Sequence, residues 1–185
     1  MTKKQLIFPG SKTPDLQLNS LKIENWSLST SRPDNFTLII IYRGLHCPIC
    51  RDYLKEFDEK IDKFNELGTN LIAISTDDYK RALQSFNEWG LESINIGYNL
   101  SPEKALEWGL FLSRGIPNSS LKIAEPKIFV EPALFLVDYD LKLYFSNIQS
   151  MPFTRPPVSQ LLTGIKFAID KDYPPRGTLK YLKKI

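Results

Sequence analysis

Cys47 and Cys50 are the only cysteines in this chain, and they lie three positions apart. The residues just before them, 37–42 (TLIIIY), form a continuous apolar run, which predicts a strand buried on both faces. A helical pattern follows, so Cys47 is expected at the start of a helix, where unpaired N–H groups and the helix dipole stabilise a thiolate. Such cysteines have pKa values of roughly 3.5–7.5. The pair is therefore expected to perform thiol–disulfide chemistry.

The residues around the reactive cysteine fit this chemistry. Cys50 lies one helical turn further on, close enough to bond to Cys47, and is expected to be the more buried, resolving thiol. Pro48 suits the first turn of a helix, where a missing N–H is tolerated. His46, the single histidine, would favour the thiolate if it were positive or hydrogen-bonding. The alternative for His46 is an exposed loop residue without a function.

Three arginines are candidates for binding an anionic or peroxide substrate at the thiolate. Arg43 is the best placed, because it lies in the loop that leads to the motif. Arg51 and Arg155 are further candidates, with surface solvation as the alternative for each. Asp77 and Asp78 follow a predicted strand and are expected to cap a helix rather than bind metal.

Other readings of the cysteine pair need features that this chain lacks. Zinc requires about four ligands, and His46, Cys47 and Cys50 are the only candidates, so no metal site is predicted. Covalent haem attachment requires histidine directly after the second cysteine, where Arg51 stands. The remaining alternative is that both cysteines are ordinary buried residues.

Composition and length place limits on the class of protein. The 185 residues fit one domain, with 42% hydrophobic and 24% charged residues. The net charge of +3 is too small and too scattered to indicate nucleic-acid binding. No stretch approaches the ~18 apolar residues that span a bilayer, and no signal peptide is recognisable. We therefore expect a cytoplasmic protein without a membrane partner, in which two neighbouring cysteines are not a structural disulfide.

Apolar runs and helical patterns alternate along the chain. After an extended lead-in (1–20), strands are expected at 37–42, 71–75 and 94–96, and a hairpin at 133–137 and 141–145. One helix is expected from the cysteines to Gly68, and others near 77–90, 101–109 and 156–169. Residues 113–127 read as a loop and 171–185 as a C-terminal tail. This order predicts an α/β fold, a mixed central sheet with helices on both faces.

The chain resembles the alkyl hydroperoxide reductase/thiol-specific antioxidant (AhpC/TSA) family, in particular peroxiredoxin-like members with a Cys-Pro-X-Cys motif. The resemblance covers nearly the whole chain as a single domain, 1–185. It is carried by these segments: 14–16 (PDL), 37–50 (TLIIIYRGLHCPIC), 71–78 (LIAISTDD), 131–140 (EPALFLVDYD), 148–155 (IQSMPFTR) and 172–177 (DYPPRG). It implies a thioredoxin-like fold and an antioxidant thiol oxidoreductase whose only redox group is the cysteine pair, without a further cofactor.

Several positions depart from the family's patterns. Peroxiredoxins carry Thr or Ser three residues before the reactive cysteine and Pro four residues earlier, where this chain has Gly44 and Ile40. They bind peroxide with a later Arg, where Pro132 stands here; thioredoxins place a cis-proline there, and the alternative is a trans proline that opens a strand. Thioredoxins also bury an acid where this chain has Ile41, and carry Trp in place of His46, so His46 or water would have to move the proton.

These observations predict that Cys47 attacks a substrate and that Cys50 resolves the product as a disulfide. The substrate is a hydroperoxide or a disulfide, and the resemblance implies a thioredoxin- or glutathione-type reductant and a homodimer. One alternative is a thioredoxin-like disulfide reductase without peroxidase activity. Another is a redox-responsive binding module that uses the segment 151–157.

Overall fold

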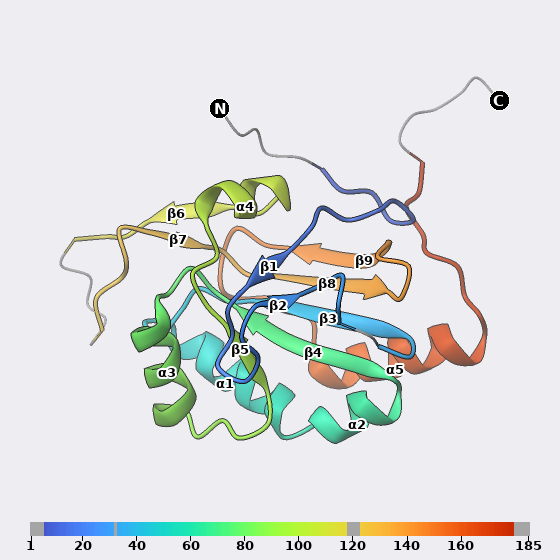
Figure 1. The fold of residues 1–185 in the computed structure, drawn as a ribbon, viewed down its shortest axis with the longest axis horizontal. Helices are drawn as coiled ribbons and strands as arrows, with labels where there is room; N and C mark the ends of the chain where they lie inside the picture. Colours follow the sequence, from blue (N-terminus) through green and yellow to red (C-terminus); the bar gives the residue numbers. More distant parts are fainter. Residues whose placement is uncertain (1–5, 32, 118–122, 180–185) are drawn as a thin grey trace.

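The buried strand that precedes the cysteines is the central strand of the sheet. The computed structural model describes residues 6–31, 33–117 and 123–179. All six residues of β3 (Phe36–Ile41) are buried. β4 (Thr69–Ile74) lies parallel to β3 on one side, and β8 (Ala133–Asp138) lies antiparallel on the other. β5 (Asn95–Gly97) and β9 (Leu143–Ile148) extend the sheet to the order β5-β4-β3-β8-β9 (Figure 1).

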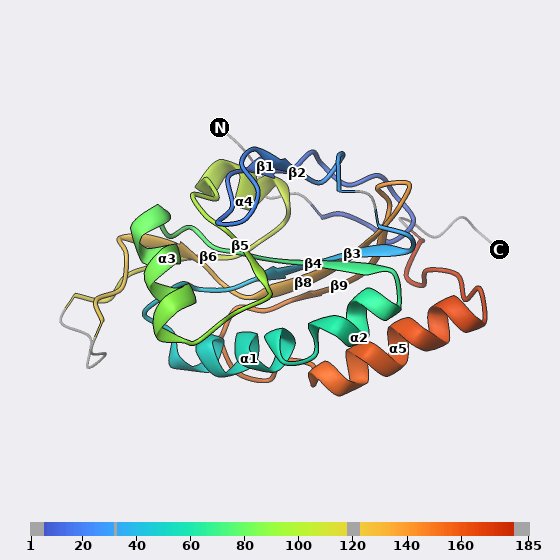
Figure 2. The ribbon, with the colours of Figure 1, turned by 60° about the horizontal axis from the view of Figure 1, so that its bottom comes forward.

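Side chains of β3 alternate between two cores, one on each face of the sheet. Leu38 and Ile40 pack into the first core and Ile39 and Ile41 into the second. The first core is covered by α1 (Pro48–Asp58), α2 (Ile61–Glu66), α3 (Tyr79–Glu88) and α5 (Val158–Asp170). The second is covered by α4 (Pro102–Glu107), by the pair β1 (Gln17–Leu18) and β2 (Trp26–Ser27), and by β7 (Ile128–Val130), which pairs with β6 (Leu112–Arg114). Figure 2 shows the helices on both faces.

Most of the expected elements are present, and the β8–β9 hairpin and the mixed sheet are confirmed. The single helix expected to run from the cysteines to Gly68 is wrong, because α1 ends at Asp58 and α2 begins at Ile61. The Asp58 carboxylate, at the end of α1, accepts hydrogen bonds from the backbone N–H groups of residues 92–94, which directly precede β5. The expected loop at 113–127 also contains most of β6.

Both chain ends contribute less regular structure. Part of the lead-in is packed, since Ile7 and Leu16 are buried and residues 17–18 form β1. The described part of the tail, up to residue 179, follows α5 without a further helix or strand, and residues 180–185 lie outside the described residues. In the part of the chain that the structure describes, no helix has the length and apolar character needed to cross a membrane.

Candidate active site

The sheet register brings three distant segments to one edge. Ile41, the last residue of β3, lies opposite Ile74 on β4 and Ala133 on β8. The loop to the cysteines therefore leaves the sheet beside the end of β4, while Pro132 directly precedes β8 at the same edge. β3 pairs along its whole length with β4 and β8, and its buried side chains fix the register of this pairing. The ends of the three strands therefore have defined positions relative to one another.

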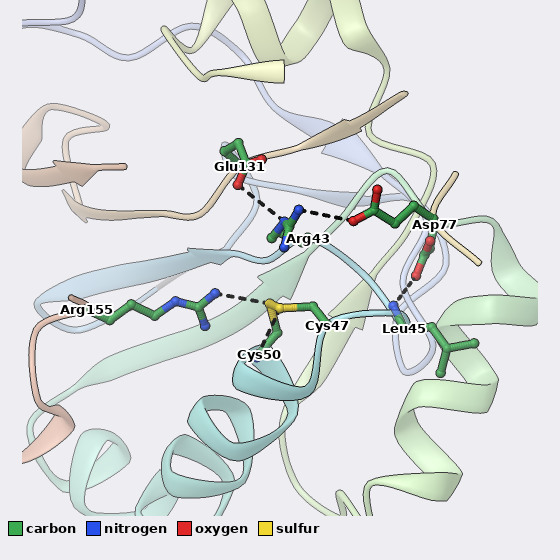
Figure 3. The surroundings of a disulfide bond; sticks show 8 residues. Arg43, Leu45, Cys47, Cys50, Asp77, Glu131 and Arg155 are labelled. Atoms are coloured by element: carbon green, nitrogen blue, oxygen red, sulfur yellow. Dashed lines mark hydrogen bonds and ion pairs between the residues drawn. A yellow bond between two sulfur atoms is a disulfide. The ribbon is translucent and has the colours of Figure 1, made fainter. Parts of the chain in front are cut away.

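A buried carboxylate holds the turn between β3 and α1. Asp77, only 1% exposed, accepts a hydrogen bond from the backbone N–H of Leu45 at 2.7 Å (Figure 3). Its other oxygen accepts one from Arg81 Nε at 2.8 Å. Gly44 lies beside it with a φ of +123°, and a Cβ there would be 2.6 Å from Asp77 Oδ2. Sequence reasoning predicted a helix cap from both aspartates, whereas Asp78 alone caps α3 and Asp77 braces this turn.

The predicted position of the two cysteines at the start of a helix is confirmed. Cys47 is the N-cap residue, its Sγ accepts a hydrogen bond from the N–H of Cys50 at 3.3 Å, and Pro48 occupies the first turn. The two cysteines form a disulfide, with their Cα atoms 5.2 Å apart. Cys47 is 1% and Cys50 0% exposed, so burial does not distinguish the nucleophile from the resolving thiol. The helix N-terminus does, because it acts on Cys47.

Arg155, which follows β9, is the arginine that reaches the sulfur atoms. Its Nη2 donates to Cys50 Sγ at 3.1 Å (Figure 3). Its guanidinium lies over the ring of Tyr53, 5.1 Å from the centroid. Tyr53, on α1, donates its hydroxyl hydrogen bond to the carbonyl of Pro156 at 2.7 Å. Burial lowers the pKa of Arg155 to about 10, so the side chain is still positive at neutral pH. A cation is thus held against the cysteine pair.

The preference for Arg43 as the cation at the cysteines is corrected by its contacts. Its guanidinium forms ion pairs with Glu125 at 3.4 Å and Glu131 at 3.3 Å, and stacks on Phe129, 4.6 Å from the ring centroid. Because two buried carboxylates from the β6–β7 region already neutralise its charge, Arg43 is not free to bind an anionic substrate. Arg51 is also paired, with the exposed Asp52 at 2.8 Å.

His46 is a buried, neutral residue rather than an exposed one. It is 3% exposed and packs edge-on against Phe129, with ring centroids 4.7 Å apart. Burial, and then the positive charge of Arg43, lower the pKa of His46 to about 4. The expectation that the His46 imidazole is positive at neutral pH is therefore wrong. Neither ring nitrogen has a hydrogen-bond partner among the described residues.

The cis form considered for Pro132 is also wrong, because none of the described residues has a cis peptide bond. Pro132 is trans, and its carbonyl accepts a hydrogen bond from the N–H of Gln149 at 2.9 Å. This bond ties the residue to the segment that carries Arg155. Pro132, Tyr53 and Arg155 line one small cavity under that segment.

A larger apolar groove opens beside this cavity, between α5 and the β8–β9 hairpin. Its volume is about 450 Å³, and it shares Asn147 and Pro156 with the small cavity. Its apolar lining residues are Leu38, Leu136, Tyr144, Phe145, Leu161 and Ile165. Gly164 of α5 opens onto it, and a Cβ at that position would meet nothing within 4 Å. No sequence pattern indicated this groove.

Within the described ranges no group of three or more His, Cys, Asp or Glu residues is arranged to hold a metal ion. The groups that meet at the cysteines are the two sulfur atoms, the helix N-terminus and the guanidinium of Arg155.

Comparisons with known proteins agree with this fold and indicate a family. The family model described as AhpC/TSA family matches residues 9–146. Among solved structures, peroxidoxin BcpB from Mycobacterium tuberculosis is 15% identical, with 88% of this chain and 98% of that chain covered and a TM-score of 0.67. The mitochondrial 2-Cys peroxiredoxin from Plasmodium falciparum is 18% identical, with 95% and 100% covered and a TM-score of 0.70. These structures share the fold. No curated protein matches the chain.

We predict that Gly44→Ala lowers the free energy of unfolding by about 3 kcal/mol or more, because the new methyl group meets the Asp77 carboxylate and the φ angle is strained. Gly90→Ala is the matched control, since Gly90 also has a positive φ (+64°) but open space at its Cβ. That variant should lose only about 1–2 kcal/mol. Urea unfolding of both variants measures the difference, and equal losses would contradict the close approach of Gly44 to Asp77.

Proposed function

This chain belongs to the AhpC/TSA family and is a thiol oxidoreductase, and we propose that it reduces hydroperoxides with Cys47 as the nucleophile. The observation that carries the proposal is the position of Cys47. Its sulfur lies at a helix N-terminus, accepts a backbone N–H, and is within bonding reach of Cys50. A thiolate stabilised in this way attacks electrophiles at neutral pH.

The proposed cycle uses the two sulfur atoms and an external dithiol. The Cys47 thiolate attacks one oxygen of the hydroperoxide, the O–O bond breaks, and the alkoxide takes a proton and leaves as an alcohol. Cys47 is then a sulfenic acid. The Cys50 thiolate attacks Cys47 Sγ, water is released, and the disulfide forms. A thioredoxin- or glutathione-type thiol reductant restores both cysteines by thiol–disulfide exchange.

Burial favours a hydroperoxide over a protein disulfide as the first electrophile. Cys47 and Cys50 are almost fully covered, and a small O–O group needs much less space at the sulfur than a protein disulfide does. The same burial favours a small thiol such as glutathione over thioredoxin as the reductant. The trans form of Pro132 removes the resemblance to the substrate-presenting loop of thioredoxins. Arg155 supplies a positive charge at the cysteine pair, although Gly44 offers no hydroxyl group there.

The groove between α5 and the β8–β9 hairpin supports an organic hydroperoxide with an apolar tail. It has the volume and the mainly apolar lining of small-molecule sites. It shares the lining residues Asn147 and Pro156 with the small cavity that Arg155 lines, so a tail in the groove would place its polar head on the side of Arg155. The tail would be bound by apolar burial, and Arg155 would bind the oxygen-bearing end.

A second candidate is the redox-responsive binding module. Arg155 belongs to the segment 151–157, and its contact with Cys50 links that segment to the state of the disulfide. Met151 and Phe153 are exposed on the same segment and would form part of the changed surface. Slow hydroperoxide turnover combined with partner retention in only one redox state would favour this candidate. The homodimer and the cytoplasmic location stay predictions from the sequence.

Hydroperoxide consumption, with a dithiol regenerating system, tests the function through three proteins. The wild type should consume hydroperoxide continuously, Cys47→Ser should lose at least about a hundredfold in rate, and Cys50→Ser should consume about one equivalent and then slow, because Cys50 resolves the sulfenic acid. Full activity of Cys47→Ser would contradict the assignment. No consumption by a wild type whose disulfide is readily reduced would point to disulfide substrates instead.

The groove is tested by Gly164→Leu, which fills it from α5 without a clash at the Cβ. We expect the KM for a fatty-acid hydroperoxide to rise about tenfold, the loss of roughly two buried CH₂ groups, while the rate with hydrogen peroxide is unchanged. Thr163→Leu is the matched control, because Thr163 is exposed and does not line the groove. Equal KM values for Gly164→Leu and the wild type would show that the tail binds elsewhere.

A further inference from the structure

Arg155 is the one guanidinium that contacts a sulfur atom among the described residues, and the sulfur belongs to Cys50 rather than Cys47. In the disulfide this sulfur is neutral and a weak acceptor. After reduction it becomes a thiol that can ionise, and a thiolate acceptor adds the attraction of opposite charges to the same hydrogen bond. The contact therefore favours the reduced, ionised form of Cys50 over the disulfide.

The guanidinium of Arg155 has no carboxylate partner among the described residues. Arg43, Arg51 and Arg81 each form an ion pair with a carboxylate, whereas no such pair involves Arg155 within the described ranges. Its flat face lies on Tyr53. A partly buried cation without a carboxylate is stabilised by any anion that forms beside it, and here that position is occupied by Cys50 Sγ.

The nearby charges do not cancel this effect. Glu131 is close enough to Arg155 to favour its charged form, and Arg43 opposes it. The Glu131 carboxylate, however, is already engaged by Arg43 at 3.3 Å and by the Ser113 hydroxyl, which donates to its other oxygen at 2.5 Å. Arg155 is thus left to interact with the cysteine pair.

We propose that Arg155 is a catalytic residue of the reductive half of the cycle, which holds Cys50 as the leaving thiolate and makes the disulfide a stronger oxidant. The proposal rests on the Cys47–Cys50 cycle of the proposed function. A dithiol reductant attacks Cys47 Sγ as a thiolate, the Cys47–Cys50 bond breaks, and its electron pair stays on Cys50 beside the guanidinium. The second reductant thiol, after losing its proton, attacks the mixed disulfide, so that the reductant leaves oxidised and Cys47 leaves as a thiolate.

Two stabilising devices then act on two different sulfur atoms. The helix N-terminus acts on the Cys47 thiolate, and Arg155 acts on the Cys50 thiolate. Stabilising the reduced form of a dithiol raises its reduction potential. A lower thiol pKa also makes Cys50 leave faster when the disulfide is attacked. The reductant is thereby directed to Cys47, which itself leaves only at the second exchange, from its mixed disulfide with the reductant.

The test is the redox equilibrium of the full chain with mixtures of reduced and oxidised glutathione. After an acid quench and alkylation, mass spectrometry gives the reduced fraction of the wild type, Arg155→Met, Arg155→Lys and Arg51→Met. We expect Arg155→Met to shift the equilibrium about tenfold towards the disulfide, which corresponds to about 30 mV. Arg155→Lys should recover part of the shift because it keeps the charge. Arg51→Met, an exposed arginine adjacent to Cys50, is the control and should match the wild type.

A second measurement covers the case in which Arg155→Met is poorly folded. The ultraviolet absorbance of the thiolate, followed against pH in Cys47→Ser, gives the pKa of Cys50 alone, and adding the uncharged, polar replacement Arg155→Gln should raise it. An unchanged equilibrium in folded Arg155→Met, or an unchanged Cys50 pKa in the Gln variant, would overturn the proposal. Neither measurement needs peroxide turnover, so a failed peroxidase assay with an intact shift would reject the proposed substrate and leave this role standing.

Discussion

The hydrogen bond from the Leu45 N–H to the buried carboxylate of Asp77 is the constraint on which the site depends. It joins the ends of β3 and β4, which the sheet has already placed side by side, and it fixes the turn that delivers Cys47 to the start of α1. A buried carboxylate is tolerated because Arg81 and the Leu45 N–H both satisfy it. Gly44 is required beside it because any side chain would occupy the same space.

The chemistry of the site depends on two sources of positive charge, each of which acts on a different sulfur atom. The helix N-terminus stabilises negative charge on Cys47, and Arg155 reaches across from the segment after β9 to Cys50. His46 adds no charge, since burial keeps it neutral at neutral pH. The nucleophile, Cys47, and the leaving group, Cys50, are therefore stabilised as thiolates by different groups, although they form one disulfide.

Sequence patterns predicted the features of the fold and the site that depend on neighbouring residues. The β-branched run at 37–42 and the cysteines after it were enough to predict the central strand and the position of Cys47 at the start of a helix, and the family resemblance implied the thioredoxin-like fold. Long-range contacts decided the rest. Arg43 is nearer to the cysteines in sequence, but two buried glutamates from the β6–β7 region pair with it, whereas Arg155 reaches Cys50 from 105 residues away. Residue type alone did not determine the trans form of Pro132.

The central claim is that Cys47 takes the oxygen from a hydroperoxide, and trapping that oxygen tests it most directly. Reduced Cys50→Ser is treated with one equivalent of hydroperoxide and then with a reagent that reacts with sulfenic acids, and the peptides are analysed by mass spectrometry. The account predicts one labelled sulfenic acid, on Cys47, and no label in Cys47→Ser. Unlabelled, fully reduced Cys47 after complete consumption of the hydroperoxide would contradict it.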